Sequence, residues 1–293
     1  MNYYNEIKNE IINNEINKKI KDYSKNKSDL ESKYRTGKLL SEAGKHYGEG
    51  IIKEYSKKLI NDIGKKYSIR YLFDMKRLYL FSKVHPLDAQ LTMSHYRILF
   101  TLKDDNEIDY YIDQVKQRNL GKRELTTIIR SKEYERLPEK TKDKLITKED
   151  NTITDFIKNP ILIKNSYNYK EISEKLLKKL ILEDIDNFLL ELGNGFSYIG
   201  NEYKIKLGDR YNYIDILLFN YIYNAFVVVE LKVTELKSEY IGQIEKYMNY
   251  IDKNIKTINQ NKTIGIIICK KDNMYVMEYC SDKRILSKEY KLV

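Results

Sequence analysis

Residues 213–233, YIDILLFNYIYNAFVVVELKV, are one of the most apolar stretches of an otherwise polar chain. The runs YIDILLF and AFVVVELKV have the composition of β-strands, and the segment between them predicts a hairpin. The stretch nevertheless carries three ionisable side chains, Asp215, Glu230 and Lys232. A buried charge is costly unless it is paired or binds a metal, so these three residues require a chemical explanation.

The predicted hairpin brings these charges together at one of its ends. In a strand, residues two apart point to the same face, so Glu230 and Lys232 share one face while Val229 and Leu231 point to the other. Asp215 lies near the start of the first strand and Glu230 near the end of the second. In an antiparallel pair these positions are neighbours. The sequence therefore predicts two carboxylates and an ammonium group at one end of the hairpin.

This group of charges predicts a specific chemistry. Two neighbouring carboxylates repel each other unless a cation lies between them, and carboxylate oxygens with room for water suit Mg²⁺ or Mn²⁺. A metal ion in this position can polarise a phosphoryl oxygen and lower the pKa of a bound water. Lys232 would orient that water and stabilise negative charge in the transition state. The arrangement suggests hydrolysis of a phosphodiester.

The sequence around the hairpin alternates between helical and strand-like patterns. This order predicts a mixed-sheet α/β domain over residues 170–293. We expect helices at 171–193 (ending at Gly193) and 237–255, and strands at 197–208, 213–219, 225–233, 263–270 and 274–280.

Residues 1–136 have a helical pattern instead, with short helices expected at 50–64, 68–84, 91–102, 107–119 and 121–131. Ser68 is expected to cap the second of them. Short helices in series with basic residues between them suit an all-α bundle or a helix-turn-helix-like module. Residues 137–169 are polar and hold two of the three prolines, which predicts a connector with room for one strand or helical turn at TITDF, residues 152–156.

The composition narrows the class of protein. With 42% hydrophobic and 33% charged residues, the 293-residue chain is globular and long enough for two domains. Its net charge of +10 suits a phosphate backbone, although an AT-rich coding bias would give the same excess of lysine. The N-terminus has no secretory pattern and no apolar run could span a bilayer. Cys269 and Cys280 exclude a four-cysteine zinc site built by this chain alone. We expect a cytoplasmic protein without a membrane partner.

The motif itself resembles a known superfamily. Asp215, fourteen intervening residues and the ELK of residues 230–232 are similar to the D…ExK core of the PD-(D/E)XK nucleases. Gln243 and Tyr247, in GQIEKY, resemble the Q-x3-Y of RecB-like members. Glu191 lies at the end of the preceding predicted helix, where many members place a further acidic residue. The order helix, three strands, helix, strand also fits this core.

Longer segments narrow the resemblance. Residues 45–135 and 155–285 are similar to YhcG-type proteins, which carry a helical domain before the nuclease domain. The resemblance implies a restriction-endonuclease-like mixed sheet flanked by helices, with Mg²⁺ or Mn²⁺ as cofactor and DNA as substrate. It also implies a genome-defence or repair setting, foreign or structured DNA, and restriction–modification or defence proteins as partners. A homodimer is expected by analogy. The first 30 or so residues resemble the family less.

Carried over to this chain, the resemblance implies a role for each motif residue. Asp215 and Glu230 would ligate the metal, and Lys232 would assist the water. Glu191 would be a third acidic group, acting as a ligand through water or as a base. Gln243 would steady the water, the lysine or the nucleic-acid backbone. A plain cross-strand charge pair and solvated helix faces are the alternatives for these positions.

Further residues are candidates for contacts with nucleic acid. Tyr247 would pack in the core or touch DNA. Arg70, Lys76, Arg77 and Arg97 could bind backbone phosphates, although a solvated helix face would give the same pattern.

Two functions therefore stay open at the level of sequence. The first is a metal-dependent endonuclease that hydrolyses DNA phosphodiester bonds. The second is a non-cleaving nucleic-acid-binding or assembly protein that uses a nuclease fold as a platform, motivated by the basic charge and the helical N-terminal half. The second function predicts salt-sensitive binding without metal-dependent cleavage.

Overall fold

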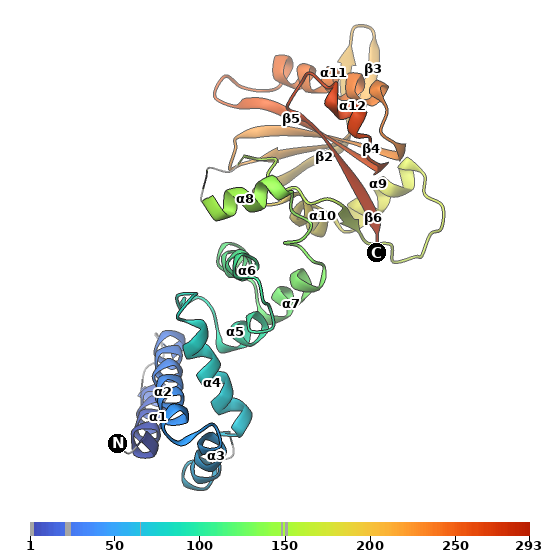
Figure 1. The fold of residues 1–293 in the computed structure, drawn as a ribbon. Coiled ribbons are helices and arrows are strands. Elements are labelled where there is room, and N and C mark those ends of the chain that lie inside the picture. Colours follow the sequence, from blue (N-terminus) through green and yellow to red (C-terminus); the bar gives the residue numbers. More distant parts are fainter. Residues whose placement is uncertain (1–2, 21–24, 65, 148, 150–151) are drawn as a thin grey trace. The chain divides into compact units, whose positions relative to one another are not determined.

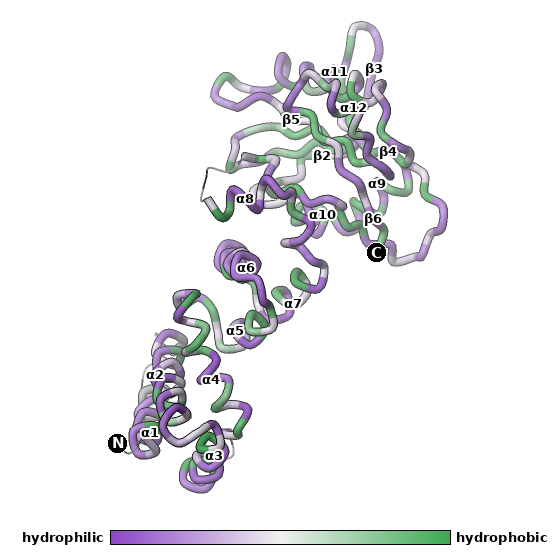
Figure 2. The backbone as a smooth tube through the Cα atoms, viewed as in Figure 1, coloured by the Kyte–Doolittle hydropathy of each residue, from purple (hydrophilic) through white to green (hydrophobic). Residues whose placement is uncertain are grey.

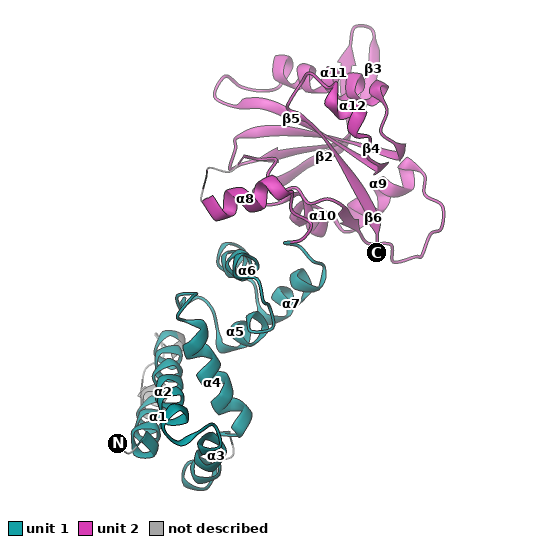
Figure 3. Cartoon of the chain, viewed as in Figure 1, with its two compact units in different colours: residues 1–134 teal, residues 135–293 magenta. Residues whose placement is uncertain are grey.

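The computed structural model describes residues 3–20, 25–64, 66–147, 149 and 152–293. The chain divides into two compact units, Met1–Tyr134 (unit 1) and Glu135–Val293 (unit 2), which are coloured separately in Figure 3. Each unit is described by itself below. Among the described helices, none is both long enough and apolar enough to cross a membrane.

Unit 1 is built from helices, as the sequence predicts. They are α1 (Tyr3–Ile20), α2 (Lys25–Tyr47), α3 (Ile51–Asp62), α4 (Ile69–Phe81), α5 (Met93–Leu99), α6 (Asp105–Arg118) and α7 (Lys122–Arg130) (Figure 1).

Local sequence features explain how these helices start and pack. The side chain of Ser68 accepts a hydrogen bond from the backbone N–H of Tyr71, so the predicted cap of α4 is confirmed. Helices α2 and α4 cross closely at Gly37, because a Cβ atom there would lie 2.0 Å from the carbonyl oxygen of Met75. The apolar stripe of α1 packs into the same core through Tyr3, Ile7 and Ile11.

Unit 2 is a six-stranded mixed sheet with helices on both faces (Figure 1), which confirms the predicted fold class. The strand order is β1-β6-β5-β4-β3-β2. Strands β4, β5, β6 and β1 pair in parallel, whereas β3 pairs antiparallel with both β4 and β2. The elements are α8 (Glu139–Thr147), β1 (Ile161–Ile163), α9 (Glu174–Glu183), α10 (Ile185–Leu192), β2 (Phe196–Leu207), β3 (Arg210–Asn220), β4 (Ala225–Glu235), α11 (Ser238–Asn254), β5 (Asn261–Lys271), α12 (Met274–Glu278) and β6 (Ile285–Leu292).

The two faces of the sheet form two hydrophobic cores. Helices α9 and α10 cover one face, where Leu177 packs with Val227 and Val229. Helix α11 covers the other face, where Ile244 packs with Val228. Strand β4 is therefore buried on both sides, which explains its continuous apolar run. Hydrophobic colour gathers in the sheet in Figure 2, whereas a surface helix such as α6 is mainly hydrophilic.

The segment 137–169 is not the connector that its polar composition predicts. It contains α8 and β1, and four of its isoleucines enter the core between the sheet and α9. These four isoleucines are Ile153, Ile157, Ile161 and Ile163. Four apolar side chains among many polar ones are too few to reveal a period, yet they are enough to fix the segment onto unit 2.

Two further predictions are wrong in detail. The helix expected over 171–193 is broken at Asp184, whose ψ of 49° is not helical, and so becomes α9 and α10. The strand expected over 274–280 is the short helix α12, which Asn273 caps through the backbone N–H of Val276. The last strand is instead β6, at residues 285–292. A short apolar run does not distinguish strand from helix, and most of α12 is exposed.

Candidate active site

The predicted hairpin forms, and its two strands part at the predicted charges. The β3–β4 ladder starts at the turn and ends at the pair Ile216 and Val229. Beyond that pair, β3 stays with β2 while β4 continues alongside β5. Asp215 and Glu230 are the next residues on the two strands, so they lie at the fork. Asp215 Oδ2 accepts a hydrogen bond of 3.0 Å from the N–H of Leu231, which ties the two strands together at this point.

Glu230 is the most unusual residue at the fork. It is only 1% exposed, and its Oε1 atom has no hydrogen-bond partner among the described residues. Its Oε2 atom accepts hydrogen bonds from Lys232 Nζ at 3.5 Å and Gln243 Nε2 at 3.2 Å. Burial raises the pKa of Glu230 to about 8, and the negative charge of Asp215 adds to this effect while Lys232 opposes it. An orphaned buried oxygen beside a second carboxylate is suited to receive a cation.

Helix α11 places Gln243 against Glu230. Gln243 and Tyr247 are one turn apart, and Gln243 Nε2 also lies within hydrogen-bond distance of the Tyr247 hydroxyl, at 3.2 Å. Tyr247 is 6% exposed and belongs to the core under the sheet. Its ring therefore has little surface to offer to DNA, and its hydroxyl helps to position Gln243. The ring of Tyr240 lies 5.1 Å from Lys232 Nζ, close enough for a cation–π contact.

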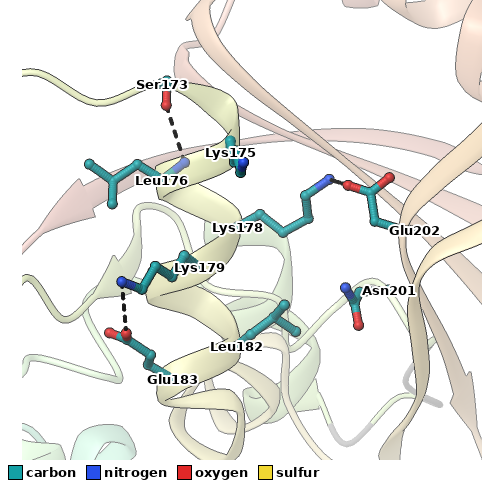
Figure 4. A pocket seen from close by; sticks show the side chains of 9 residues that line it. All are labelled: Ser173, Lys175, Leu176, Lys178, Lys179, Leu182, Glu183, Asn201 and Glu202. Atoms are coloured by element: carbon teal, nitrogen blue, oxygen red, sulfur yellow. Dashed lines mark hydrogen bonds and ion pairs between the residues drawn. The ribbon is translucent and has the colours of Figure 1, made fainter.

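Helix α9 contributes two residues that the sequence alone does not reveal. Glu174 Oε2 lies 4.0 Å from Lys232 Nζ. One turn later, Lys178 Nζ donates to Asp215 Oδ1 at 2.7 Å and to Glu202 of β2, a contact drawn in Figure 4. Ser173 caps α9 and so fixes where this face begins. An acid and a base four residues apart on a helix is the only sequence signal for them, and most such pairs are surface ion pairs.

Lys178 also borders an open cavity next to the site. The cavity has a volume of about 630 Å³ and lies between α9 and β2, with lysine side chains along it (Figure 4). Burial disfavours the charge of Lys178, but the hydrogen bonds to Asp215 and Glu202 outweigh burial and raise its pKa. Lys178 therefore compensates the negative charge of Asp215.

Glu191, predicted as a third acidic group of the site, lies elsewhere. Both of its carboxylate oxygens bind the guanidinium of Arg136, and Oε2 also accepts the N–H of Leu162 at 2.9 Å. The two side chains are 9% and 12% exposed. Because α10 starts anew after Asp184, Glu191 faces β1 rather than the fork. These contacts hold Arg136 and Leu162 against α10.

The donor set at the fork fits a hard divalent cation. Within the described ranges, three or more His, Cys, Asp or Glu side chains do not gather into a ready-made metal site. Mg²⁺ does not require one, since it is usually bound by one or two carboxylates together with waters and substrate phosphates. Asp215 and Glu230 would be those two carboxylates. The orphaned Oε1 of Glu230 is the atom that supports this fit.

The basic residues predicted for unit 1 fall into two groups. Lys76 forms an ion pair with Glu49 and is not part of the cavity lining that the three arginines share. Arg70, Arg77 and Arg97 line one cavity between α4 and α5.

A mixed sheet with Asp, Glu and Lys at a strand fork is the core of a PD-(D/E)XK nuclease. Comparison with known families agrees with this class. Residues 154–293 match the family model described as the YhcG PDDEXK nuclease domain, and residues 3–136 match the DUF1016 N-terminal domain. The chain belongs to the YhcG-type family of PD-(D/E)XK nucleases, as its sequence predicts.

Individual relatives are distant. YhcG of Escherichia coli (strain K12), provisionally described as a nuclease, is 22% identical over 86% of this chain and 78% of its own length. Two solved structures are similar at a TM-score of 0.29 and 18% identity. A repair endonuclease from Pyrococcus abyssi covers 43% of this chain and 49% of its own. A structure of EndoMS with double-stranded DNA covers 44% and 48%. This chain thus spans about half of each, and neither structure adds to the assignment.

Proposed function

We propose that this protein is a metal-dependent endonuclease that hydrolyses DNA phosphodiester bonds with Mg²⁺ or Mn²⁺. The observation that carries the proposal is the state of Glu230, whose carboxylate is buried and half-unpartnered beside Asp215 and Lys232. A buried carboxylate with an unpaired oxygen destabilises the protein unless a cation binds that oxygen and compensates the charge. The second candidate, a non-cleaving platform, offers no reason to keep this costly arrangement intact.

Each residue of the fork has a definite part in the proposed reaction. Asp215 and Glu230 would hold the metal, which supplies charge stabilisation at the scissile phosphate and activates water. Lys232, held by Glu230 and the Tyr240 ring, would donate a hydrogen bond to the attacking water or the phosphate oxygen. Gln243 keeps the Glu230 carboxylate in place through its amide.

The finer parts of the proposal rest on the family and on charge. The net charge of +10 supports an anionic substrate, and DNA is the substrate that the family resemblance implies. A homodimer, in which two sites cut two strands, and a setting in genome defence or repair belong to the proposal on the same basis. Lys178, which binds Asp215 and lines the neighbouring cavity, would add positive charge beside an anionic substrate.

A cleavage panel tests the proposal. The purified full-length protein is incubated with single-stranded, duplex, nicked and junction DNA in the presence of Mg²⁺, Mn²⁺ or EDTA. We expect cleavage of at least one substrate with metal, and its loss in Glu230→Gln and in Lys232→Ala. Glu245→Gln is the matched control, because Glu245 is exposed on α11 and outside the fork. Equal cleavage by the parent and both site variants would overturn the assignment, and binding without cleavage of any substrate would favour the platform.

A further inference from the structure

Unit 1 contains a second cavity whose lining is unusually cationic. It has a volume of about 470 Å³ and lies between α4 and α5. Arg70, Phe73 and Arg77 contribute from α4, at spacings of three and four residues that place them on one stripe of the helix. Arg97 of α5 and Phe100, the residue that follows the end of α5, line the other side, three residues apart. Three guanidinium groups and two phenyl rings therefore face one space.

An ion pair between Asp74 and Arg97 joins the two walls of this cavity, although the Arg97 side chain is 43% exposed. Asp74 of α4 is 8% exposed and accepts a hydrogen bond of 2.7 Å from Arg97 Nε. The guanidinium of Arg97 also lies 5.6 Å from the ring of Tyr71. These contacts join α4 to α5, so the two helices that carry the lining groups are held together before any ligand arrives. Preorganisation of this kind lowers the entropy lost on binding.

The charge of the cavity is not balanced by the protein. Asp74 offsets Arg97, but in the described part of the chain neither Arg70 nor Arg77 has a carboxylate within 4.0 Å. The Arg77 guanidinium instead lies 5.9 Å from the ring of Phe100. Two uncompensated arginines in one concave site fit the forked, two-oxygen geometry of a phosphate group.

The aromatic side of the cavity indicates what is attached to that phosphate. Phe73 is 38% exposed although it is a large apolar side chain. An exposed phenyl ring beside phosphate-binding arginines is the arrangement on which unpaired nucleic-acid bases stack. A volume of about 470 Å³ also lies within the usual range for small-ligand sites.

We propose that this cavity binds one nucleotide unit, a phosphate joined to an unpaired base, with the phosphate on Arg70 and Arg77 and the base against Phe73. The unit comes from single-stranded DNA or from a free nucleotide. Duplex DNA does not fit, because its bases are already stacked and paired. This proposal rests on the proposed nuclease function. It adds that unit 1 recognises unpaired strands of the substrate.

Binding without metal tests the proposal independently of cleavage. The full-length protein is titrated in EDTA against a fluorescent thymidine oligomer, and anisotropy is followed at several salt concentrations. Arg70→Ala and Arg77→Ala should each weaken binding by about tenfold, the loss expected for a charged hydrogen bond. Each should also lower the slope of log K against log salt by about 0.7, the value for one phosphate contact on a single strand. Phe73→Ala should weaken binding by about tenfold without changing that slope.

Controls separate the alternatives. Arg123→Ala removes the same side chain from an exposed position of α7 and should leave the affinity within about twofold of the parent value. Competition by thymidine monophosphate would support a free nucleotide as the ligand, and competition by the oligomer alone would support a DNA strand. Competition by inorganic phosphate as strong as by the mononucleotide would overturn the role of the base. If Arg70→Ala and Arg77→Ala remain folded by circular dichroism and bind with unchanged affinity and salt slope, the site is refuted. That result would leave the nuclease proposal untouched, because no step of this assay involves cleavage.

Discussion

Replacing Glu230 by glutamine should make the metal-free protein more stable at alkaline pH. The glutamine side chain keeps the shape of glutamate and still offers an oxygen to Gln243, but it carries no charge into the buried fork. The wild-type carboxylate must ionise there beside Asp215, with only Lys232 nearby to compensate it. The variant is thus expected to lose function and gain stability at the same position.

The magnitude follows from the pKa of Glu230. Burial, with a further contribution from Asp215, raises this pKa from 4.5 to about 8. Below pH 4.5 the carboxyl group is protonated in both the folded and unfolded states and costs nothing. As the pH rises toward 8 the unfolded chain releases the proton and the folded protein keeps it, so stability falls by about 1.36 kcal/mol per pH unit. The full loss, present above pH 8, is roughly 5 kcal/mol as an upper limit.

Urea unfolding in EDTA at pH 5, 7 and 8.5 measures this effect. The quantity of interest is the unfolding free energy of Glu230→Gln minus that of the parent, because titrations elsewhere in the protein cancel in the difference. We expect the difference to grow in favour of the variant by about 3 kcal/mol or more between pH 5 and pH 8.5. Glu245→Gln, on the exposed face of α11, should show no such trend. A difference that is independent of pH would refute the claim that a destabilised carboxylate occupies the fork.

Three further perturbations follow from the contacts of the site. Mg²⁺ should raise the melting temperature of the parent protein but not that of Glu230→Gln. At a metal concentration ten times the Kd, the stabilisation of the parent should be about 1.4 kcal/mol. An equal shift in both proteins would exclude a metal site at the fork. In EDTA, Lys178→Met should lower the free energy of unfolding by about 3 kcal/mol, the cost of breaking a buried ion pair with Asp215. In calorimetry the same variant should bind Mg²⁺ with a midpoint at lower concentration, because the ammonium group no longer competes for Asp215. An unchanged or higher midpoint would contradict this prediction. Glu191→Ala should cost about 3 kcal/mol, because it removes the carboxylate that pairs with the buried guanidinium of Arg136. The shift in melting temperature caused by Mg²⁺ should persist. Loss of that shift in a folded variant would show that Glu191 belongs to the site.

The sequence predicts the centre of the site better than its margins. Period-two alternation and the hairpin turn are local features, so they correctly place Asp215 next to Glu230 and Lys232. Gln243 comes to the same place because one face of α11 must pack on the sheet, and its neighbours on that face are apolar. Short-range patterns were sufficient wherever a single element, or two consecutive ones, determined the geometry.

Local patterns do not predict which acidic residue of the preceding helical segment lies near the fork. Residues 171–193 contain Glu174 near one end and Glu191 near the other, and an amphipathic pattern does not say which end approaches the fork. The break at Asp184 turns α10 toward β1, and this turn depends on the isoleucines of residues 153–163. Tertiary packing against the isoleucines of residues 153–163 therefore determines which glutamate approaches the fork. The apolar pattern of that segment is too weak to predict this packing.

The fork also explains how an apolar strand can carry charges without losing its place in the sheet. Beyond Val229, β4 has lost β3 as a neighbour on one side, while Glu230 and Leu231 still pair with β5 on the other. The carboxylate of Asp215 takes over the N–H of Leu231 and so replaces a backbone acceptor with a side-chain one. The second oxygen of the same carboxylate accepts a hydrogen bond from the ammonium group of Lys178. One side chain thus closes the sheet where the ladder stops and supplies charge where the chemistry requires it, and the fold and the site depend on a single branching point.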